Sequence, residues 1–304
     1  PETHKKVSPK ELELLKQWIE EGARYDDPWT YKNPIKHPAP AVQNKDWPAN
    51  FIDHFILSKL EEVAISPSPD TDPVTLLRRL NFDLTGLPPA PADRERFLRS
   101  FESNPQIAIE AEVERLLKSP HFGERLAIYW LDLVRYADTV GYHGDQDHNI
   151  SPYRDYVIRA FNENMPFDRF TREQLAGDLL PTPTKQQLVA TGYNRLLQTT
   201  HEGGLQQAEY RAIYQADRVR NVSAVWMGAT VGCAQCHHHK YDPYTAKDFH
   251  TLGAFFADID DEQHFKSGTN ALPTHRPPEI TVLTANQEAD LDSLNKVLND
   301  LSKG

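Results

Sequence analysis

The run Cys233-Ala234-Gln235-Cys236-His237 contains both cysteines of the chain. It follows the pattern C-x-x-C-H, which attaches haem of the c type. In such a site, the two thiols form thioether bonds to the edge of the porphyrin, and the histidine that follows becomes the proximal ligand of the iron. We therefore expect covalently bound haem c, held by Cys233 and Cys236, with His237 on the iron. The expected fold is a mainly α-helical, c-type cytochrome-like domain with long loops.

Three other uses of this run are weighed against haem attachment. A thioredoxin-like C-x-x-C should follow a strand and open a helix, whereas a long helical pattern precedes Cys233. A zinc site could use Cys233, Cys236 and two of His237, His238 and His239, but no second pair of ligands is obvious elsewhere. A disulfide across so short a loop would be strained. Haem attachment is therefore the favoured interpretation.

Composition limits the class of protein. With 304 residues, 39% of them hydrophobic and 25% charged, the chain is long enough for a well-buried core. The formal charge is 33 − 44 = −11 and no basic block occurs, which argues against binding to nucleic acid or to anionic membrane surfaces. No apolar run approaches the roughly 18 residues that a transmembrane segment needs.

Helical periodicity and capping signals predict the order of the segments. Ser8-Pro9-Lys10-Glu11 predicts the start of a first helix, and Ser151, Thr184 and Thr245 are predicted caps of later ones. Residues 281–283 are read as a short strand. Because the chain begins at Pro1 and ends in what looks like the start of another element, we expect a piece of a longer protein. The expected segments are a first helix in 1–23, a Pro-rich linker at 24–48, a haem-binding helical domain at 49–262, an irregular connector at 263–283, and the start of a coiled-coil helix at 284–304. The coiled coil is expected because Leu291, Leu294, Leu298 and Leu301 recur at heptad spacing.

A polar loop at 138–149 is the second candidate site. It contains three carboxylates and two imidazoles within a dozen residues: Asp138, Asp145, Asp147, His143 and His148. Oxygen and nitrogen donors in such a cluster are typical of a second metal site, with Asp138, Asp145 and Asp147 as its ligands, or of a substrate-facing loop. A solvated polar loop is the alternative. The catalytic candidates are His143, Asp145, His201 and Glu202, the last two from a polar loop that precedes a long helix.

The sixth position of a haem iron needs a residue that folding brings across the porphyrin. His238 and His239 are excluded, since the chain cannot loop over the ring within one or two residues of His237. The histidine candidates are His250, His201, His143 and His148, and the chain offers only two methionines, Met165 and Met227. We rank a histidine ligand above an open site, and an open site above methionine.

Several long stretches resemble the signature motifs of the planctomycete cytochrome-c-like family, a domain of unknown function with a C-x-x-C-H haem motif. They are FGERLAIYWLDLVRYAD at 122–138, YRDYVIRAFNEN at 153–164, EQLAGD at 173–178 and VGCAQCHHHKYDP at 231–243. The likeness covers about residues 47–260. Residues 4–23 resemble the tail of the small cytochrome-c domain that precedes this one in many members. The family motif usually continues Cys-His-Asp-His-Lys, and this chain has His238 at the Asp position.

The resemblance implies an exported, periplasmic bacterial protein, because haem of the c type is attached outside the cytoplasmic membrane, and it makes carbohydrate a candidate partner. The expected function is electron relay for a redox partner protein or a fused domain. An alternative is a haem-dependent oxidoreductase acting on a carbohydrate or peroxide at an open haem face. A third hypothesis is a non-redox binding or scaffold module with structural haem.

Overall fold

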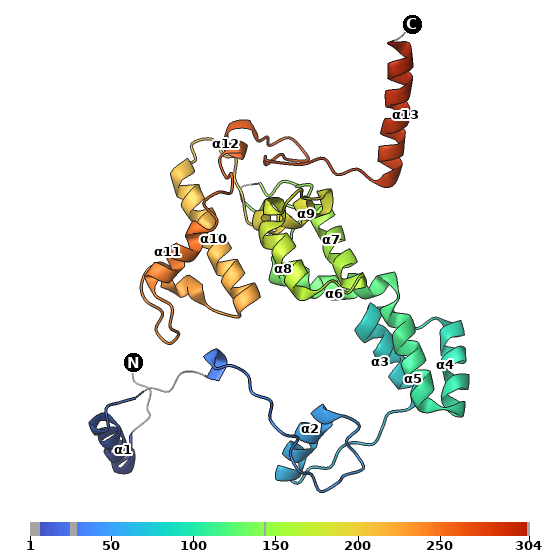
Figure 1. The fold of residues 1–304 in the computed structure, drawn as a ribbon, viewed down its shortest axis with the longest axis vertical. Coiled ribbons are helices and arrows are strands. Elements are labelled where there is room, and N and C mark those ends of the chain that lie inside the picture. The colour runs from blue at the N-terminus through green and yellow to red at the C-terminus, as the bar shows by residue number, and fades with distance from the viewer. Residues whose placement is uncertain (1–6, 25–28, 143, 303–304) are drawn as a thin grey trace. The chain divides into compact units, whose positions relative to one another are not determined.

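The computed structural model describes residues 7–24, 29–142 and 144–302. Over these ranges the chain is mainly helical, and its β-structure consists of isolated bridges, with no strand (Figure 1). The predicted helical class is confirmed. The chain divides into two compact units, residues 1–70 and residues 71–304, so this division cuts the segment 49–262 that the sequence suggested as one domain.

The first unit contains α1 (Pro9–Glu20), the short 3₁₀ helix η1 (Trp29–Tyr31) and α2 (Phe51–Glu62). Helix α1 begins at the predicted capping box: Ser8 Oγ accepts from Glu11 N at 3.3 Å, and the Glu11 carboxylate accepts from Ser8 N at 2.7 Å. No residue of α1 is buried. In the linker, Gln43 N donates to both oxygens of the Glu61 carboxylate, so this part of the linker lies along α2.

The second unit begins with three helices that share a small core of Leu77, Phe97 and Ala108. Each helix has proline in its first turn, where the missing N–H costs nothing. The buried Glu112 carboxylate accepts from Arg96 at 3.0 Å and from Arg115 at 2.6 Å, which ties two of these helices together. The three helices are α3 (Pro73–Thr85), α4 (Pro91–Ser103) and α5 (Pro105–Leu117).

The largest core of the second unit is rich in aromatic side chains. Trp130 packs edge-on against Phe170 and Trp226, with ring centroids 4.8 and 4.9 Å away. Gly123 allows two helices to approach closely, because a Cβ there would lie 2.3 Å from the Ile158 carbonyl oxygen. The elements around this core are α6 (Pro120–Leu133), α7 (Ser151–Asn162), α8 (Phe167–Ala176), η2 (Gly177–Leu179), α9 (Lys185–Ala190), η3 (Thr191–Arg195) and the C-terminal half of α10 (Gln207–Met227).

Two of the three later caps are confirmed. Thr184 and Thr245 each form a capping box, with Gln187 and Asp248. The predicted cap at Ser151 is wrong: the N-cap is Ile150, and the Ser151 hydroxyl is directed to the side chain of Asn149 instead. Ser151 is instead the first residue of α7, one position too late to act as its cap.

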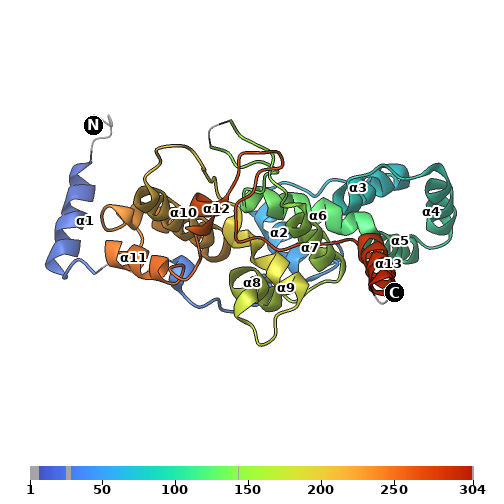
Figure 2. The ribbon, with the colours of Figure 1, turned by 90° about the horizontal axis from the view of Figure 1, so that it is seen from above.

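After α10, the chain forms η4 (Val231–Gln235) and α11 (Ala246–Ala254). Helices α10 and α11 lie side by side in both views (Figures 1 and 2). They enclose a second core of Ala216, Val219, Ala229, Val231, Ala234 and Phe249. Val231 and Ala234 of this core belong to η4, so the core attaches the C-x-x-C-H run to the rest of the second unit.

The segment after α11 differs from its prediction. It contains a short helix, α12 (Gln263–Ser267), and residues 281–283 form no strand. Its polar side chains are buried, since His264, Thr274 and Arg276 are at most 2% exposed. The final helix, α13 (Ala285–Leu301), has no buried residue, and Lys185 reaches it through an ion pair with Glu288 at 2.9 Å. A coiled-coil partner for its leucines is not shown.

Candidate functional site

The C-x-x-C-H run lies on η4 and the turn that follows it. Val231 and Ala234 point into the second core and are 2% and 0% exposed, so they anchor the backbone on either side of Cys233. Both thiols are free and exposed. Because the apolar residues of the turn face inward, the two sulfur atoms are left accessible from outside.

His237 is exposed and has a defined tautomer. Its Nδ1 lies 2.7 Å from the carbonyl oxygen of His238. A carbonyl only accepts, so Nδ1 carries the proton and Nε2 keeps its lone pair. A metal-bound histidine shows this same arrangement, in which the outer ring nitrogen donates to a backbone carbonyl and the other binds the metal. Two accessible thiols and an imidazole with a free Nε2 are the donor set that haem c requires, so the residues present fit the group.

His238 stands at the start of α11. Its Nδ1 accepts from Ala246 N at 3.1 Å. Ala246 is the first residue of α11, and the first backbone N–H groups of a helix have no partner within it. His238 therefore supplies one of the acceptors that α11 needs, and this role did not emerge from the sequence.

The polar loop at 138–149 folds back on itself and pairs with the segment before α10. Thr139 and Asp147 form an antiparallel bridge, and Thr199 N donates to Val140 O at 2.9 Å. Asp145 accepts from Gly141 N at 2.8 Å, so its carboxylate stabilises the loop itself. Asp138 accepts from the hydroxyl of Tyr136.

A metal site in this loop receives no support from the geometry. Within residues 7–24, 29–142 and 144–302, no group of three or more His, Cys, Asp or Glu side chains could hold a metal ion. His143 lies outside the described residues. The ligand set Asp138, Asp145 and Asp147 thus remains a prediction from sequence.

The loop does border a cavity of about 500 Å³. Its opposite walls come from η3 and α10, and Arg135 and Asp217 close one side with two parallel hydrogen bonds of 2.6 and 2.7 Å. Among the sequence candidates, Asp145 and His148 reach this cavity. The polar side chains on its wall are Arg135, Thr139, Tyr142, Asp145, His148, Arg195, Gln198 and Asp217.

Arg135, Arg195 and Asp217 escaped prediction from sequence. Each occupies a helical or turn position where a charged residue is ordinary, and Arg135 and Asp217 are brought together from distant segments. The positive φ of Arg135, 61°, is the local sign that the chain turns sharply there. Arg195 donates to the carbonyl oxygens of Asp260, Arg276 and Pro277, and burial lowers its pKa.

His201 and Glu202 lie beside the cavity, not in it. They border a narrow space with Tyr142, Gln146, Thr200, Asn270 and Arg276. The His201 carbonyl accepts from Asn270 at 3.1 Å. The two polar loops are thus neighbours, although they belong to different segments of the chain.

The family model described as PSCyt2, "Protein of unknown function (DUF1549)", matches residues 51–261. The chain belongs to this family. No curated protein and no solved structure matches it. The matched range contains the C-x-x-C-H run and the polar loop at 138–149. None of the described helices combines the length and the apolar character that crossing a membrane requires.

The histidine candidates for a sixth iron ligand lie at different distances from η4. Thr200 N donates to the Tyr214 hydroxyl at 3.1 Å, so His201 lies near Tyr214. His148 lines the same cavity as Tyr214. Helix η4 itself packs on α10 near Arg220, which donates to the Gln235 side chain and lies about 9 Å along the helix from Tyr214. His250 is exposed on α11, which packs on η4. His250 is thus carried by an element that contacts η4 directly.

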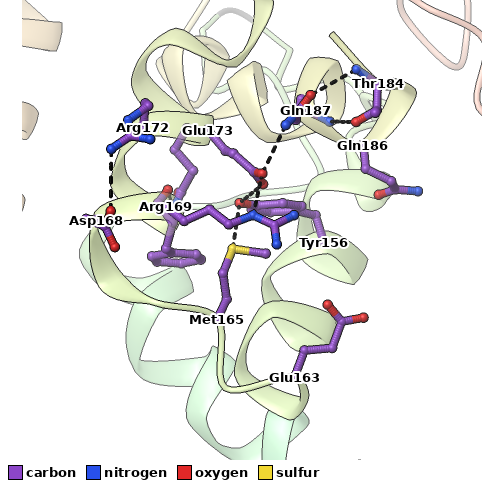
Figure 3. Close-up of polar contacts among 12 residues, drawn as sticks. Tyr156, Glu163, Met165, Asp168, Arg169, Arg172, Glu173, Thr184, Gln186 and Gln187 are labelled. Carbon is purple, nitrogen blue, oxygen red and sulfur yellow. Dashed lines mark hydrogen bonds and ion pairs between the residues drawn. The ribbon is translucent and has the colours of Figure 1, made fainter. Parts of the chain in front are cut away.

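The two methionines also differ. Met165 lies beside a buried hydrogen-bond network on α7 and α8 (Figure 3), where its sulfur is 3.6 Å from the hydroxyl of Tyr156. It packs against the largest core and is turned into the protein. Met227, at the end of α10, is 51% exposed. Met165 is therefore removed from the ligand candidates, and Met227 remains.

Proposed function

We propose that this chain is an exported c-type cytochrome domain that relays electrons for a redox partner protein or a fused domain. Cys233 and Cys236 would hold haem through thioether bonds, and His237 would bind the iron through Nε2. When bound, the group supplies reversible one-electron chemistry at iron. The planctomycete origin and the periplasmic location belong to the same proposal and rest on the sequence resemblance.

The observation that carries this proposal is the state of the three donor groups. Both thiols are free and exposed. The Nδ1 of His237 is hydrogen bonded at 2.7 Å to a carbonyl, which leaves Nε2 as the ring nitrogen with a lone pair to offer. The buried Val231 and Ala234 hold the turn on which they are placed. These side chains offer the donors for haem c in an ordered turn.

The first test is the covalent bond. Chains produced together with a haem-attachment system should keep a peroxidase-like stain on a denaturing gel, because thioether bonds survive unfolding. Replacing both Cys233 and Cys236 by Ala should abolish the stain, and Lys247→Ala, an exposed change on α11, should leave it unchanged. A colourless native protein that contains one zinc ion per chain would contradict the proposal and favour the zinc site.

The second test is the sixth ligand, which we propose to be His250. The ferric spectrum should be low-spin, and His250→Ala should convert it to high-spin. His201→Ala and His148→Ala test the other candidates in the same way, and His121→Ala, an exposed histidine on α6, is the matched control. A wild-type protein that is already high-spin and binds cyanide at once has an open site, and this result would replace the relay with an enzyme.

We propose substrate binding in the cavity of about 500 Å³ as a second candidate function. Its wall offers both donors and acceptors, and its charged groups, Arg135 and Arg195 against Asp145 and Asp217, balance in number. A neutral molecule with many hydroxyl groups suits such a wall, with Tyr142 as an apolar face. Carbohydrate is therefore the preferred substrate class, and peroxide the smaller alternative, for a haem-dependent oxidoreductase.

Titration calorimetry with neutral oligosaccharides tests this second function. Gln198→Ala and Tyr142→Ala should each weaken binding by about tenfold, since each removes one contact from the cavity wall. Tyr241→Ala, which changes an exposed tyrosine outside the cavity, should have no effect. Equal heats for all three variants would show that the cavity is not the binding site.

A further inference from the structure

The imidazole of His239 links the two ends of the turn that contains the C-x-x-C-H run. Its Nδ1 accepts from Tyr241 N at 3.2 Å and from Asp242 N at 2.7 Å. Its Nε2 lies 3.1 Å from Thr230 Oγ1. The side chain is only 9% exposed, in contrast to the exposed His237 and His238.

These contacts determine which atom donates and which accepts in each hydrogen bond of the His239 ring. Because two backbone N–H groups donate to Nδ1, this atom carries no proton, and Nε2–H donates to the Thr230 hydroxyl. The Thr230 hydroxyl donates in turn to Asp242 Oδ2 at 3.4 Å. The backbone N of His239 donates to Tyr244 O at 2.7 Å. Both ring nitrogens are in use, so His239 is free for neither iron nor zinc.

Through Thr230, the hydrogen bond of His239 reaches the start of the C-x-x-C-H run. Thr230 is the residue before η4, and its carbonyl accepts from Cys233 N at 3.2 Å. The hydrogen bond from His239 to Thr230 therefore closes a ring of chain, residues 230–239, that contains both thiols and the proximal imidazole. One end of this ring is fixed by η4, and the other by the turn at 239–244.

We propose that His239 and Thr230 form a clasp that sets the shape of residues 231–238 before haem is bound. His239 is thus a positioning residue, which acts through the backbone on Cys233, Cys236 and His237. A loop that is ordered in advance does not lose its conformational entropy at the moment of binding, so the ligand binds more readily. This inference rests on the proposed function, and its test separates the two.

The test uses the full chain, three single variants and one double variant. His239→Ala removes the clasp, Thr230→Val removes the hydroxyl at nearly constant shape, and His239→Asn keeps an acceptor near the position of Nδ1. His121→Ala, an exposed histidine on α6, is the matched control. Far-UV circular dichroism establishes that each variant retains its helices.

The first measurement is made without haem. Amide hydrogen exchange at Tyr241 and Asp242 should accelerate by roughly fivefold or more in His239→Ala, since it loses the acceptor for both amides. His239→Asn should recover much of the protection. The double variant Thr230→Val/His239→Ala should alkylate at Cys233 and Cys236 no faster than His239→Ala alone, because the two residues act as one unit. Unchanged exchange in His239→Ala would overturn the clasp.

The second measurement follows haem. The fraction of chains with covalent haem should fall several-fold in His239→Ala and Thr230→Val, and recover in part in His239→Asn. The reduction potential of the loaded fraction should shift, which a purely structural loss elsewhere would not cause. If the wild type takes no covalent haem, the proposed function fails, while the exchange measurement still decides on the clasp. Equal haem content and potential in all variants would show that the clasp does not position the site.

Discussion

Three consecutive imidazoles in this chain have three different partners. His237 donates to a carbonyl, His238 accepts from the first N–H of α11, and His239 bridges Thr230 and the turn at 241–242. The place of His237 directly after Cys236 predicts an iron ligand, and that use stays a prediction. The roles of His238 and His239 depend on Ala246 and Thr230, which only the folded chain brings to them.

At His238, the cap on α11 can be tested directly. His238→Ala should lower the free energy of unfolding by about 0.5–1 kcal/mol, the usual effect of losing a helix cap. His238→Asp should be at least as stable as the wild type, because a carboxylate accepts the same N–H and suits the positive end of the helix. Urea unfolding at pH 7 measures both, with His121→Ala as control. An Asp variant less stable than the Ala variant would contradict this role.

Glu173 is the most strongly hydrogen-bonded carboxylate of the network in Figure 3. It is 3% exposed and accepts from Arg169 at 2.8 Å, from Tyr156 at 3.0 Å and from Gln187 at 3.2 Å. Burial alone would raise the pKa of Glu173, but these hydrogen bonds outweigh it and hold the pKa below the usual value. The ionised form is thus favoured by folding.

Replacement of Glu173 should have a large effect. Glu173→Ala should lower the free energy of unfolding by about 3 kcal/mol, because it leaves the partners unpaired and opens a cavity. Since the folded pKa lies below the unfolded one, the wild type should lose this contribution as pH falls below about 4.5, and Glu173→Gln should not. Glu163→Gln, an exposed change in the same view, is the control. An equal acid response in Glu173→Gln and wild type would exclude Glu173 as its source.

At the scale of elements, capping signals predicted the starts of helices better than hydrophobic periodicity alone predicted whole elements. The boxes at Ser8, Thr184 and Thr245 were predictable because each needs only residues three positions apart. Helix α12 and the missing strand at 281–283 were not, since that segment is ordered by buried polar contacts with distant residues. The carbonyl oxygen of Arg276, for example, accepts from Arg195 at 2.7 Å.

Helix α13 should be dispensable for the stability of the second unit. It has no buried residue, and Lys185–Glu288 is an exposed ion pair of a kind that contributes about 0–1 kcal/mol. Removal of residues 285–304, which takes away all of α13 and this ion pair, should therefore change the Tm by less than about 2 °C. Differential scanning calorimetry at two protein concentrations provides the measurement. A larger fall, or a fall that depends on concentration, would show that the leucines of α13 are buried against another chain.

At the scale of the molecule, buried arginines hold the segment after α11 to the rest of the second unit. Arg218 on α10 pairs with Asp261 through two hydrogen bonds of 2.6 Å. Arg195 donates to the carbonyls of Arg276 and Pro277. Arg195 also lines the cavity of about 500 Å³. The motif could be read from the sequence because its residues are consecutive, whereas the cavity could not. The wall joins residues such as Arg135 and Asp217, which no local pattern connects.

His264 makes this region sensitive to acid. It is fully buried against Tyr214 and Phe265, and burial, followed by the charges of Arg195 and Arg276, lowers its pKa from 6.5 to about 4. The unfolded chain therefore binds a proton that the folded chain does not between these values, so stability falls as pH drops through this window. From pH 7 to pH 5, up to about 2 kcal/mol should be lost.

His264→Phe keeps a ring in the same place and should remove most of this pH dependence. Thermal melts at pH 7 and pH 5 compare it with the wild type, and His121→Ala again serves as control. A wild-type melting temperature that does not change between these pH values would show that His264 is already charged in the folded chain.

The exposure of both thiols has a practical consequence for any preparation of this protein. The chain has no other cysteine, so a disulfide between two molecules can join them only at Cys233 or Cys236. A sulfur already bound to a porphyrin carbon has no thiolate with which to form that bond. If the chain binds haem as we propose, the crosslinked dimer band on a non-reducing gel of air-exposed protein should contain only chains with a free thiol, and the covalent haem should be found in the monomer band.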